Sequence, residues 1–192
     1  MAQSTGLDKV RTAIFISGNG SNLKSIVKFS KLKKSPISVN LIISDNTKSK
    51  GLEYGKVFKI KKKIFNFKKK FIEKKIINEL KKNKINLICL AGFMKILSNF
   101  FIKSFKGKIL NIHPSLLPKF KGLNTHQRAI ENNEKYSGCT VHFVSSKLDS
   151  GKIILQKKVK INKKDNAKTL AKKILIQEHK LYPRAILKVF SL

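Results

Sequence analysis

The sequence predicts an α/β fold built on a doubly wound, mostly parallel sheet with antiparallel C-terminal strands. Short apolar runs alternate with helix-like segments from residue 11 to residue 112, as in proteins that wind helices around a parallel sheet. The run "INLICLA" at 85–91 is almost continuously apolar, which is typical of a strand buried on both faces. Two later runs are joined by the short segment "SKLDSG", which favours antiparallel pairing.

The first half of the chain predicts strands that alternate with helices. Strands are expected at 11–17, 37–44 and 85–91, where β-branched and other apolar residues gather. A short helix is expected at 51–58. Another is expected from Ser21, and its apolar face would hold Leu23, Ile26, Val27 and Leu32.

The strongest helical pattern lies at 65–83. Apolar residues recur there at helical spacing, with lysines between them: Phe67, Phe71, Ile72, Ile76 and Leu80. We expect one long amphipathic helix over this range.

The second half of the chain predicts three more strands and a closing helix. The strands are expected at 108–112, 139–145 and 152–161. The helix is expected from about Asn166 to Val189, with a kink at Pro183. Neither an internal repeat nor a Pro/Gly/Ser-rich linker interrupts the 192 residues, so a single domain over 1–192 is expected.

The charge of the chain is extreme, with a net +33 and a sequence pI near 10.4. Such a charge suggests nucleic acid, but only three of the 43 basic residues are arginine, the residue preferred for bidentate recognition of bases and phosphates. The lysines are spread over many segments and stand between apolar residues. We therefore expect mainly solvated faces and no specific nucleic-acid partner, with some general affinity for polyanions left open.

Composition also bears on the compartment. Apolar residues make up 41% of the chain, as in globular proteins, and no apolar run is long enough to span a bilayer. The start "MAQSTGLDKVR" lacks the apolar segment of a secretory signal. Cys89 and Cys139 lie in separate apolar runs without metal-ligand or redox spacing. A reduced, cytoplasmic setting without a membrane partner is expected.

The segment "SGNGSN" at 17–22 joins the first predicted strand to the first predicted helix. Its glycines allow the backbone to approach a ligand closely, and the helix N-terminus suits a phosphate. Ser21 and Asn22 add side-chain donors. The segment is neither G-x-G-x-x-G nor a Walker A sequence, and a tight turn with Ser21 as the helix N-cap explains the same residues equally well.

The segment "ILNIHPSLLP" at 109–118 places two polar residues at the end of a predicted strand. Asn111 and His113 point the same way because successive side chains of a strand alternate between faces. Ligands of open α/β sheets bind outside the carboxyl ends of the strands. An asparagine amide can donate to a developing oxyanion, and a histidine can move a proton near neutral pH. We expect both residues to face a ligand crevice.

The remaining titratable residues give weaker signals. His126 and His179 have no distinctive context, and His142 lies in the middle of a predicted strand, which fits a core residue or one that acts through a neighbour. Asp149 precedes Ser-Gly, as turn aspartates do, or it orients and charges His113. No G-x-S-x-G sequence and no Cys/His/carboxylate cluster is present, so we expect direct transfer between two bound substrates, without a metal.

Six stretches share their order with a known family and cover nearly the whole chain: "ISGNGSNL" (16–23), "LAGFMKIL" (90–97), "LNIHPSLLPKFKGLNTHQRAI" (110–130), "GCTVHFV" (138–144), "LDSGKIILQ" (148–156) and "QEHKLYP" (177–183). Together they resemble the folate-dependent phosphoribosylglycinamide formyltransferases of purine biosynthesis. The resemblance implies a Rossmann-like formyltransferase fold. It also implies transfer of a formyl group from 10-formyltetrahydrofolate, the co-substrate, to the amine of glycinamide ribonucleotide. Both substrates are small anions, and a monomer or homodimer is expected.

The resemblance also implies which residues form the site. The catalytic trio would be Asn111, His113 and Asp149, and the glycinamide ribonucleotide would contact Gly20, Ser21, Asn22 and Glu178. The folate would contact two segments and one lysine before them: Lys69, Met94, Lys95, Ile96, Leu97, Asn111, Ser145, Ser146, Lys147, Leu148 and Asp149.

In the implied mechanism the substrate amine attacks the formyl carbon and gives a tetrahedral intermediate. Asn111 and protonated His113 would stabilise its oxyanion. His113, or a water held by Asp149, would then relay a proton to the folate nitrogen that leaves.

The chain departs from the family pattern at four positions. Lys69 and Lys95 stand where arginines are common, so a point charge replaces a planar fork near the folate. Asn124 stands in place of a common histidine, and Lys152 in place of the usual proline. None of these changes removes a member of the catalytic trio.

Three alternatives differ from this interpretation. Formyltetrahydrofolate hydrolases usually read "HHSFLP" where this chain has "HPSLLP", and they carry an extra N-terminal domain. Methionyl-tRNA formyltransferases share the "SLLP" region but normally have a further C-terminal domain, for which 192 residues leave no room. A basic nucleic-acid binder would gather its lysines on one face with aromatic residues between them, a pattern that we do not see.

Overall fold

The first strand, β1 (Val10–Ile16), lies inside the sheet between β2 and β4 and is buried on both faces. In the computed structural model, which describes residues 9–190, Ala13 and Phe15 point into one core, and Ile14 and Ile16 point into the other. This alternation follows from the two-residue period of a strand. β1 thus divides the core into two layers, one on each face of the sheet.

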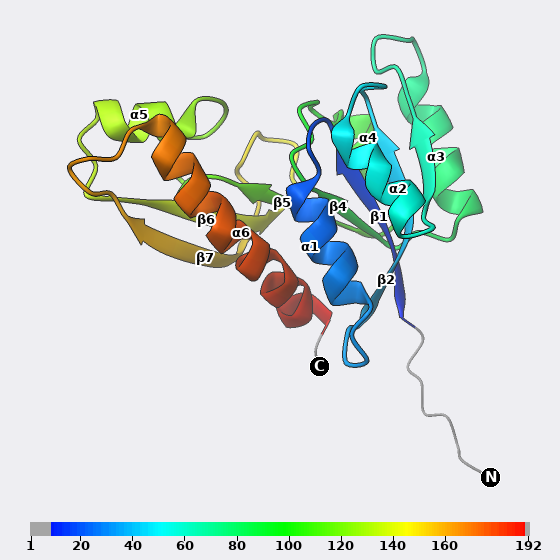
Figure 1. Ribbon diagram of the computed structural model, residues 1–192. Helices are drawn as coiled ribbons and strands as arrows, with labels where there is room; N and C mark the ends of the chain where they lie inside the picture. The colour runs from blue at the N-terminus through cyan, green and yellow to red at the C-terminus, as the bar shows by residue number, and fades with distance from the viewer. Residues whose placement is uncertain (1–8, 191–192) are drawn as a thin grey trace.

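The sheet has seven strands in the order β3-β2-β1-β4-β5-β6-β7 (Figure 1). The first five pair in parallel, whereas the β5–β6 and β6–β7 pairs are antiparallel, so the predicted mixed sheet is confirmed. The strands other than β1 are β2 (Ile37–Ser44), β3 (Lys61–Ile64), β4 (Leu87–Leu90), β5 (Lys108–His113), β6 (Tyr136–Phe143) and β7 (Ile153–Lys160).

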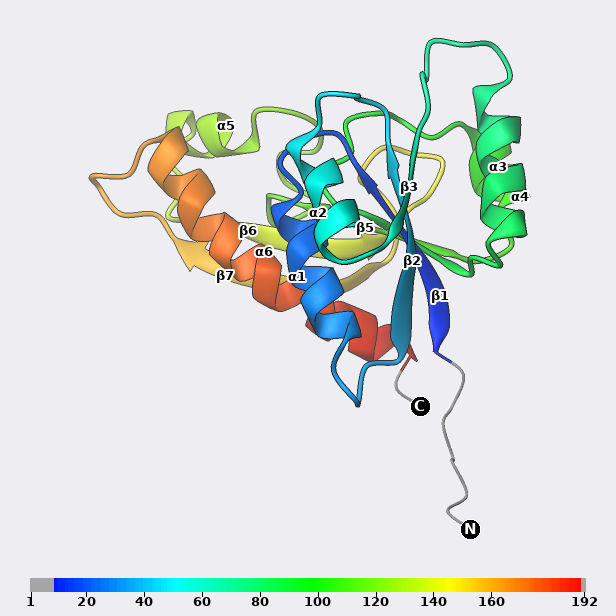
Figure 2. The same ribbon diagram turned by 45° about the vertical axis from the view of Figure 1, so that its right-hand side comes forward.

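Helices cover both faces of the sheet (Figure 2). The buried residues of α3 (Ile72–Lys82) and α4 (Asn99–Ser104) belong to one core cluster. The other cluster takes residues from the remaining helices: α1 (Ser21–Ser30), the 3₁₀ turn η1 (Lys50–Leu52) with α2 (Glu53–Val57), α5 (Thr125–Glu131) and α6 (Ala167–Phe190). A helix layer therefore lies on each side of the sheet, as in doubly wound folds.

Pro183 lies inside α6, which continues to Phe190. A proline lacks the backbone N–H that would bond to the carbonyl four residues earlier, here that of His179. The Ser25 hydroxyl of α1 donates to this carbonyl at 2.7 Å. Pro183 therefore leaves the His179 carbonyl without a donor from its own helix. The Ser25 hydroxyl supplies that donor and so connects α1 to α6.

Tyr182 fixes α6 to the middle of the sheet. Its ring is fully buried, and its hydroxyl lies 3.1 Å from the Leu90 carbonyl of β4 and 3.0 Å from the Leu110 carbonyl of β5. A buried hydroxyl needs such partners because an unpaired polar group in an apolar core is costly. Tyr182 thus bridges two adjacent strands just before their carboxyl ends.

The long helix expected at 65–83 is wrong over its first seven residues, about two turns. α3 begins only at Ile72, and Phe71 before it has a left-handed φ of 59° and an exposed side chain. Phe67 instead packs its ring edge-on against Phe93 at 5.2 Å. Both phenylalanines match the helical period, but the left-handed conformation of Phe71 prevents the helix from extending back to Phe67. Leu32 also differs from expectation, since it lies beyond α1 and is exposed.

Three short elements were not predicted: β3, α4 and α5. β3 reads "KKKI", its four residues are exposed, and it is held at the sheet edge by backbone pairing to β2. The stretch 1–8, on which most of the expectation about a signal segment rests, lies outside the described residues. Among helices within 9–190, none combines the length and apolarity needed to cross a membrane.

Replacing Tyr182 by phenylalanine tests the bridge to the strands. We expect Tyr182→Phe to lower the free energy of unfolding by about 1–3 kcal/mol, because two buried carbonyls lose a donor while the packing volume is kept. Urea unfolding measures the change. Tyr136→Phe, which alters a half-exposed tyrosine, is the matched control and should shift the midpoint little. Equal effects of the two changes would contradict the role given to Tyr182.

Candidate active site

The loop between β1 and α1 is held by close glycine packing. Gly20 is the N-cap of α1 with a left-handed φ of 71°, and a Cβ placed there would lie 2.7 Å from the Cα of Gly51. Any side chain at Gly20 would therefore be strained and would clash. Within the described chain no side chain caps α1, so Ser21 is the first helical residue and not its cap. The backbone N–H groups of the first turn are left available to a ligand.

Asn22 of this loop meets Glu178 of α6. The Asn22 Nδ2 donates to the Glu178 Oε2 at 2.7 Å, and both side chains are buried. Burial raises the pKa of the Glu178 carboxyl, and the hydrogen bond from Asn22 opposes this shift only in part. The Oδ1 of Asn22 is also buried and has no partner among residues 9–190. Two residues predicted for the ribonucleotide thus lie in direct contact, 156 positions apart in the sequence.

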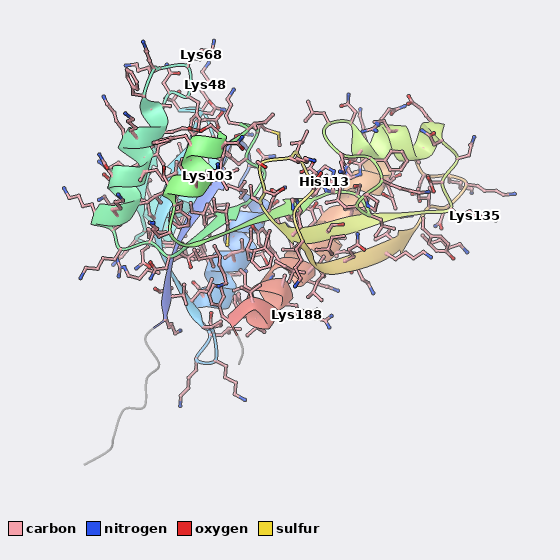
Figure 3. All side chains as sticks on the ribbon, turned by 180° about the vertical axis from the view of Figure 1, so that it is seen from behind. Lys48, Lys68, Lys103, His113, Lys135 and Lys188 are labelled. Carbon is pink, nitrogen blue, oxygen red and sulfur yellow. The ribbon has the colours of Figure 1, made fainter. Side chains whose placement is uncertain are left out.

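The end of β5 brings together the predicted catalytic trio. Asn111 and His113 lie on the same face of the strand, and Asp149 reaches them from the loop between β6 and β7. The Nδ1 of His113 lies 3.4 Å from the Oδ2 of Asp149, and both side chains are buried. Figure 3 labels His113 beside this yellow loop.

Both ring nitrogens of His113 face acceptors. The Nε2 lies 2.8 Å from the Phe120 carbonyl, and the Nδ1 faces the Asp149 carboxylate. The Phe120 carbonyl can only accept a hydrogen bond, so the Nε2 carries a proton and donates it there. Asp149 in turn accepts from the Gly122 backbone N–H at 2.9 Å. The loop that holds Phe120 and Gly122 therefore contacts both titratable members of the trio.

His142 lies beside Asn111 on the neighbouring strand. Its Nε2 is 3.2 Å from the Asn111 Nδ2, and its Nδ1 is 2.8 Å from the Phe143 carbonyl. Burial lowers the pKa of His142, against smaller raising effects of the Phe143 carbonyl and Asp149. The sequence offered two roles for His142, and the structure favours the residue that acts through a neighbour over plain core packing.

His126 of α5 lies close enough to His113 to be affected by its charge. Burial lowers its pKa, and so does the charge of His113. Its Nδ1 is buried without a partner in the described part of the chain. Both effects favour the neutral form of the His126 ring.

The residues predicted for the folate divide into two groups. Lys69, Lys95 and Ile96 line a surface hollow of about 470 Å³, together with Phe67, Phe71, Ile72, Glu73, Lys74 and Phe100. This hollow combines aromatic walls with cations, as a flat anionic ligand requires. None of its lining residues belongs to the catalytic trio.

The other predicted folate residues differ in exposure. Met94, Lys147 and Leu148 are exposed, whereas Leu97 is buried in the core beside α4 and its side chain is not open to a ligand. The Met94 N–H donates to the Ser17 hydroxyl at 2.8 Å, which ties this segment to the end of β1. In the second segment the Ser145 hydroxyl bonds to the Lys147 carbonyl, while Ser146 lies between them.

The two thiols are not suited to nucleophilic catalysis. Cys89 and Cys139 are both free and buried, and burial raises the pKa of each to about 12. A nucleophilic cysteine needs an accessible thiolate. In the part of the chain that the structure describes, no three His, Cys, Asp or Glu side chains gather into a group that could hold a metal ion.

Sequence reasoning missed the backbone groups that complete this site. The carbonyls of Phe120 and Phe143 and the N–H of Gly122 set the ring and carboxylate orientations, yet a backbone group leaves no mark in the sequence. For His142 a signal existed, since a polar residue stands in the apolar run "CTVHFV". Only the strand register shows that it faces Asn111.

Comparisons with known proteins agree on one family. The family described as formyl transferase matches residues 10–186. Phosphoribosylglycinamide formyltransferase from Escherichia coli is 38% identical over 178 residues, which cover 90% of this chain and 84% of that protein. The crystal structure of phosphoribosylglycinamide formyltransferase from Brucella melitensis superposes with a TM-score of 0.89 at 41% identity, covering 95% of this chain and 96% of the other.

Longer relatives match as well. The human trifunctional purine biosynthetic protein adenosine-3 is 40% identical over 187 residues, or 95% of this chain. This chain spans only 18% of the length of that relative.

The raised pKa of Glu178 gives a pH-dependent prediction. A carboxyl whose pKa is higher in the folded state stabilises the fold below its unfolded pKa, and this stability is lost as the pH rises through the folded value. Glu178→Gln should therefore raise the free energy of unfolding near neutral pH, and the gain should shrink as the pH falls toward about 4. Urea midpoints across this range measure it, with the exposed Glu53→Gln as control. A gain that is constant with pH would contradict the prediction.

Proposed function

The chain belongs to the formyl transferase family and is a formyltransferase, and from that premise we propose that it transfers a formyl group to the amine of glycinamide ribonucleotide in purine biosynthesis. The observation that carries the proposal is the convergence of Asn111, His113 and Asp149 at the end of β5. The named relatives of similar length support the choice of acceptor.

The acceptor's phosphate would bind at the start of α1. Gly20 permits a close backbone approach, and the first-turn N–H groups with Ser21 offer donors. The buried pair of Asn22 and Glu178 lies next to this loop and offers a carboxylate to hydroxyl or amine groups of the ligand. The phosphate of the ligand and its hydrogen-bond donors would therefore bind at neighbouring positions.

The donor is proposed to be 10-formyltetrahydrofolate. Segment 94–97 and the loop 145–149 match the folate-binding segments of the family, and both expose apolar side chains, Met94 and Leu148. Lys69 and Lys95 line the adjoining hollow and provide charge for an anionic tail. Because the side chain of Leu97 is buried, its contribution would come from its backbone.

In the proposed reaction the amine of the ribonucleotide attacks the formyl carbon, and the carbonyl oxygen becomes an oxyanion. An N–H of Asn111 donates to this oxyanion, and a ring N–H of His113 joins it in exchange for its bond to the Phe120 carbonyl. The new C–N bond leaves a proton on the attacking nitrogen. Asp149, directly or through a water, moves that proton toward the folate nitrogen as the old C–N bond breaks.

The wider setting follows from the charge and the fold. We propose a single catalytic domain that acts in the cytoplasm on two small anionic substrates, as a monomer or a homodimer. Lysines lie on widely separated parts of the molecule: in Figure 3, Lys68 and Lys103 are labelled on the left, Lys135 on the right and Lys188 near the bottom. This distribution supports a general positive field and gives no support to a nucleic-acid groove.

An absorbance assay of folate turnover tests the proposed reaction. We expect purified protein to consume 10-formyltetrahydrofolate only when glycinamide ribonucleotide is present. Turnover without any acceptor would identify a hydrolase. No turnover in either case would overturn the proposal and direct the search to tRNA and other nucleic acids.

The trio is tested by Asn111→Ala and His113→Ala. Each change removes a donor aimed at the oxyanion and should lower kcat by about 10²–10³-fold. His179→Ala is a control, since this histidine lies on α6 and its side chain has no hydrogen bond to the trio among residues 9–190. Near-full turnover in either trio variant would contradict the assignment.

The positive field gives a prediction about salt. With a net charge of +33 and two anionic substrates, kcat/KM should fall by roughly tenfold between about 0.05 M and 0.5 M NaCl. The value of kcat at saturating substrate should change much less, because it does not include the encounter. A kcat/KM that is insensitive to salt would count against electrostatic capture.

A further inference from the structure

We infer that His142 is a positioning residue which, as its Nδ1–H tautomer, holds the Asn111 amide with one N–H directed at the reacting carbonyl. The inference rests on the proposed function, because a positioned amide has a catalytic meaning only if Asn111 meets an oxyanion. On this inference, the hydrogen bond to His142 determines which end of the Asn111 amide faces the substrate.

The strand register places the two residues together. Asn111 of β5 is paired directly with His142 of the antiparallel strand β6. Side chains opposite each other in such a pair lie on the same face and touch. The pairing of β6 with β7 shifts its register between Val141 and His142, and irregularities of this kind bend a strand and re-aim side chains near functional sites.

The backbone next to His142 determines its tautomer. The Phe143 carbonyl can only accept a hydrogen bond, so the Nδ1 that lies 2.8 Å away carries the proton. In a neutral ring the Nε2 is then an acceptor. The Asn111 Nδ2 lies 3.2 Å from it and donates one of its two hydrogens.

This bond fixes the direction of the Asn111 amide. The Asn111 Nδ2 keeps a second hydrogen for the substrate, while the amide oxygen is turned away from His142. Without the acceptor at Nε2, the amide could rotate by half a turn and present its oxygen. That oxygen would repel a developing oxyanion instead of stabilising it.

The charged groups around His142 bear on its protonation. The Oδ1 of Asp149 lies 3.8 Å from the His142 Nε2, and the second charged neighbour is His113 on β5. Burial has the largest effect and lowers the pKa of His142, so the ring stays neutral near physiological pH. A protonated ring would direct an N–H at the amide nitrogen of Asn111 and favour the reversed amide.

Two substitutions distinguish the role of the His142 Nε2 as a hydrogen-bond acceptor from the role of its ring in packing. His142→Gln keeps an acceptor oxygen near the position of Nε2, whereas His142→Phe keeps a buried ring without one. We expect the phenylalanine variant to lose about 10²-fold in kcat with KM for both substrates changed less than about twofold, and the glutamine variant to recover most of this loss. His179→Phe is the matched control and should keep kcat.

The variants also predict different pH profiles. Protonation of His142 should reduce kcat on the acid side, and His142→Gln should lose this contribution because an amide does not titrate. Equal losses in the two variants, or a loss confined to KM, would overturn the inference and indicate a packing role.

The tautomer can be measured without any turnover. Nitrogen–proton NMR correlations of the imidazole rings should show His142 protonated at Nδ1 near neutral pH. A ring protonated at Nε2, or at both nitrogens, would overturn the inference even if the enzyme is fully active.

Absent formyl transfer in the wild-type protein would overturn the proposed function and this inference together. An active wild type with an equally active His142→Phe would overturn only the inference.

Discussion

The change of strand direction at β5 is the constraint on which the site depends. β5 runs parallel to β4 and antiparallel to β6. Its carboxyl end therefore lies beside the end of β4, as in any doubly wound sheet, and also beside residues from the middle of β6. A wholly parallel sheet would provide the first neighbour but not the second. The antiparallel direction of β6 places the His142 imidazole beside Asn111. It also brings the loop after β6, which carries Asp149, to the carboxyl end of β5.

Burial then gives these few polar groups their chemistry. Asp149 and His113 lie together out of solvent, and backbone groups of one loop bind both of them. At the position proposed for the ribonucleotide, Glu178 is buried and has a raised pKa, with Asn22 as its partner. α6 contributes Glu178 and also fixes β4 and β5 through Tyr182. One helix therefore supports both halves of the candidate site, so the position of α6 affects the proposed site as well as the packing of the core.

The sequence predicts the buried strands and the long helices because their patterns follow burial directly. The sequence-based prediction fails where backbone pairing or backbone conformation determines the structure. β3 has three lysines in four residues and is a strand only because β2 pairs with it. The helical period includes Phe67 and Phe71, yet the left-handed conformation of Phe71 starts α3 later. In the candidate site, Asn111 and His113 are evident from the strand that ends there. The contact of His142 with Asn111, 31 positions earlier in the sequence, depends on the register of β5 and β6.

Both open edges of the sheet are lined with lysine. β3 presents Lys61, Lys62 and Lys63 to solvent, and the last half of β7 presents Lys157, Lys158 and Lys160. An uncovered edge strand has unpaired backbone groups and can recruit the edge of another molecule, which is a route to aggregation. Two such edges brought together here would place rows of like charge in contact. The lysine-rich composition therefore protects the sheet from edge-to-edge association, and it does so at the two positions where a sheet of this order is exposed.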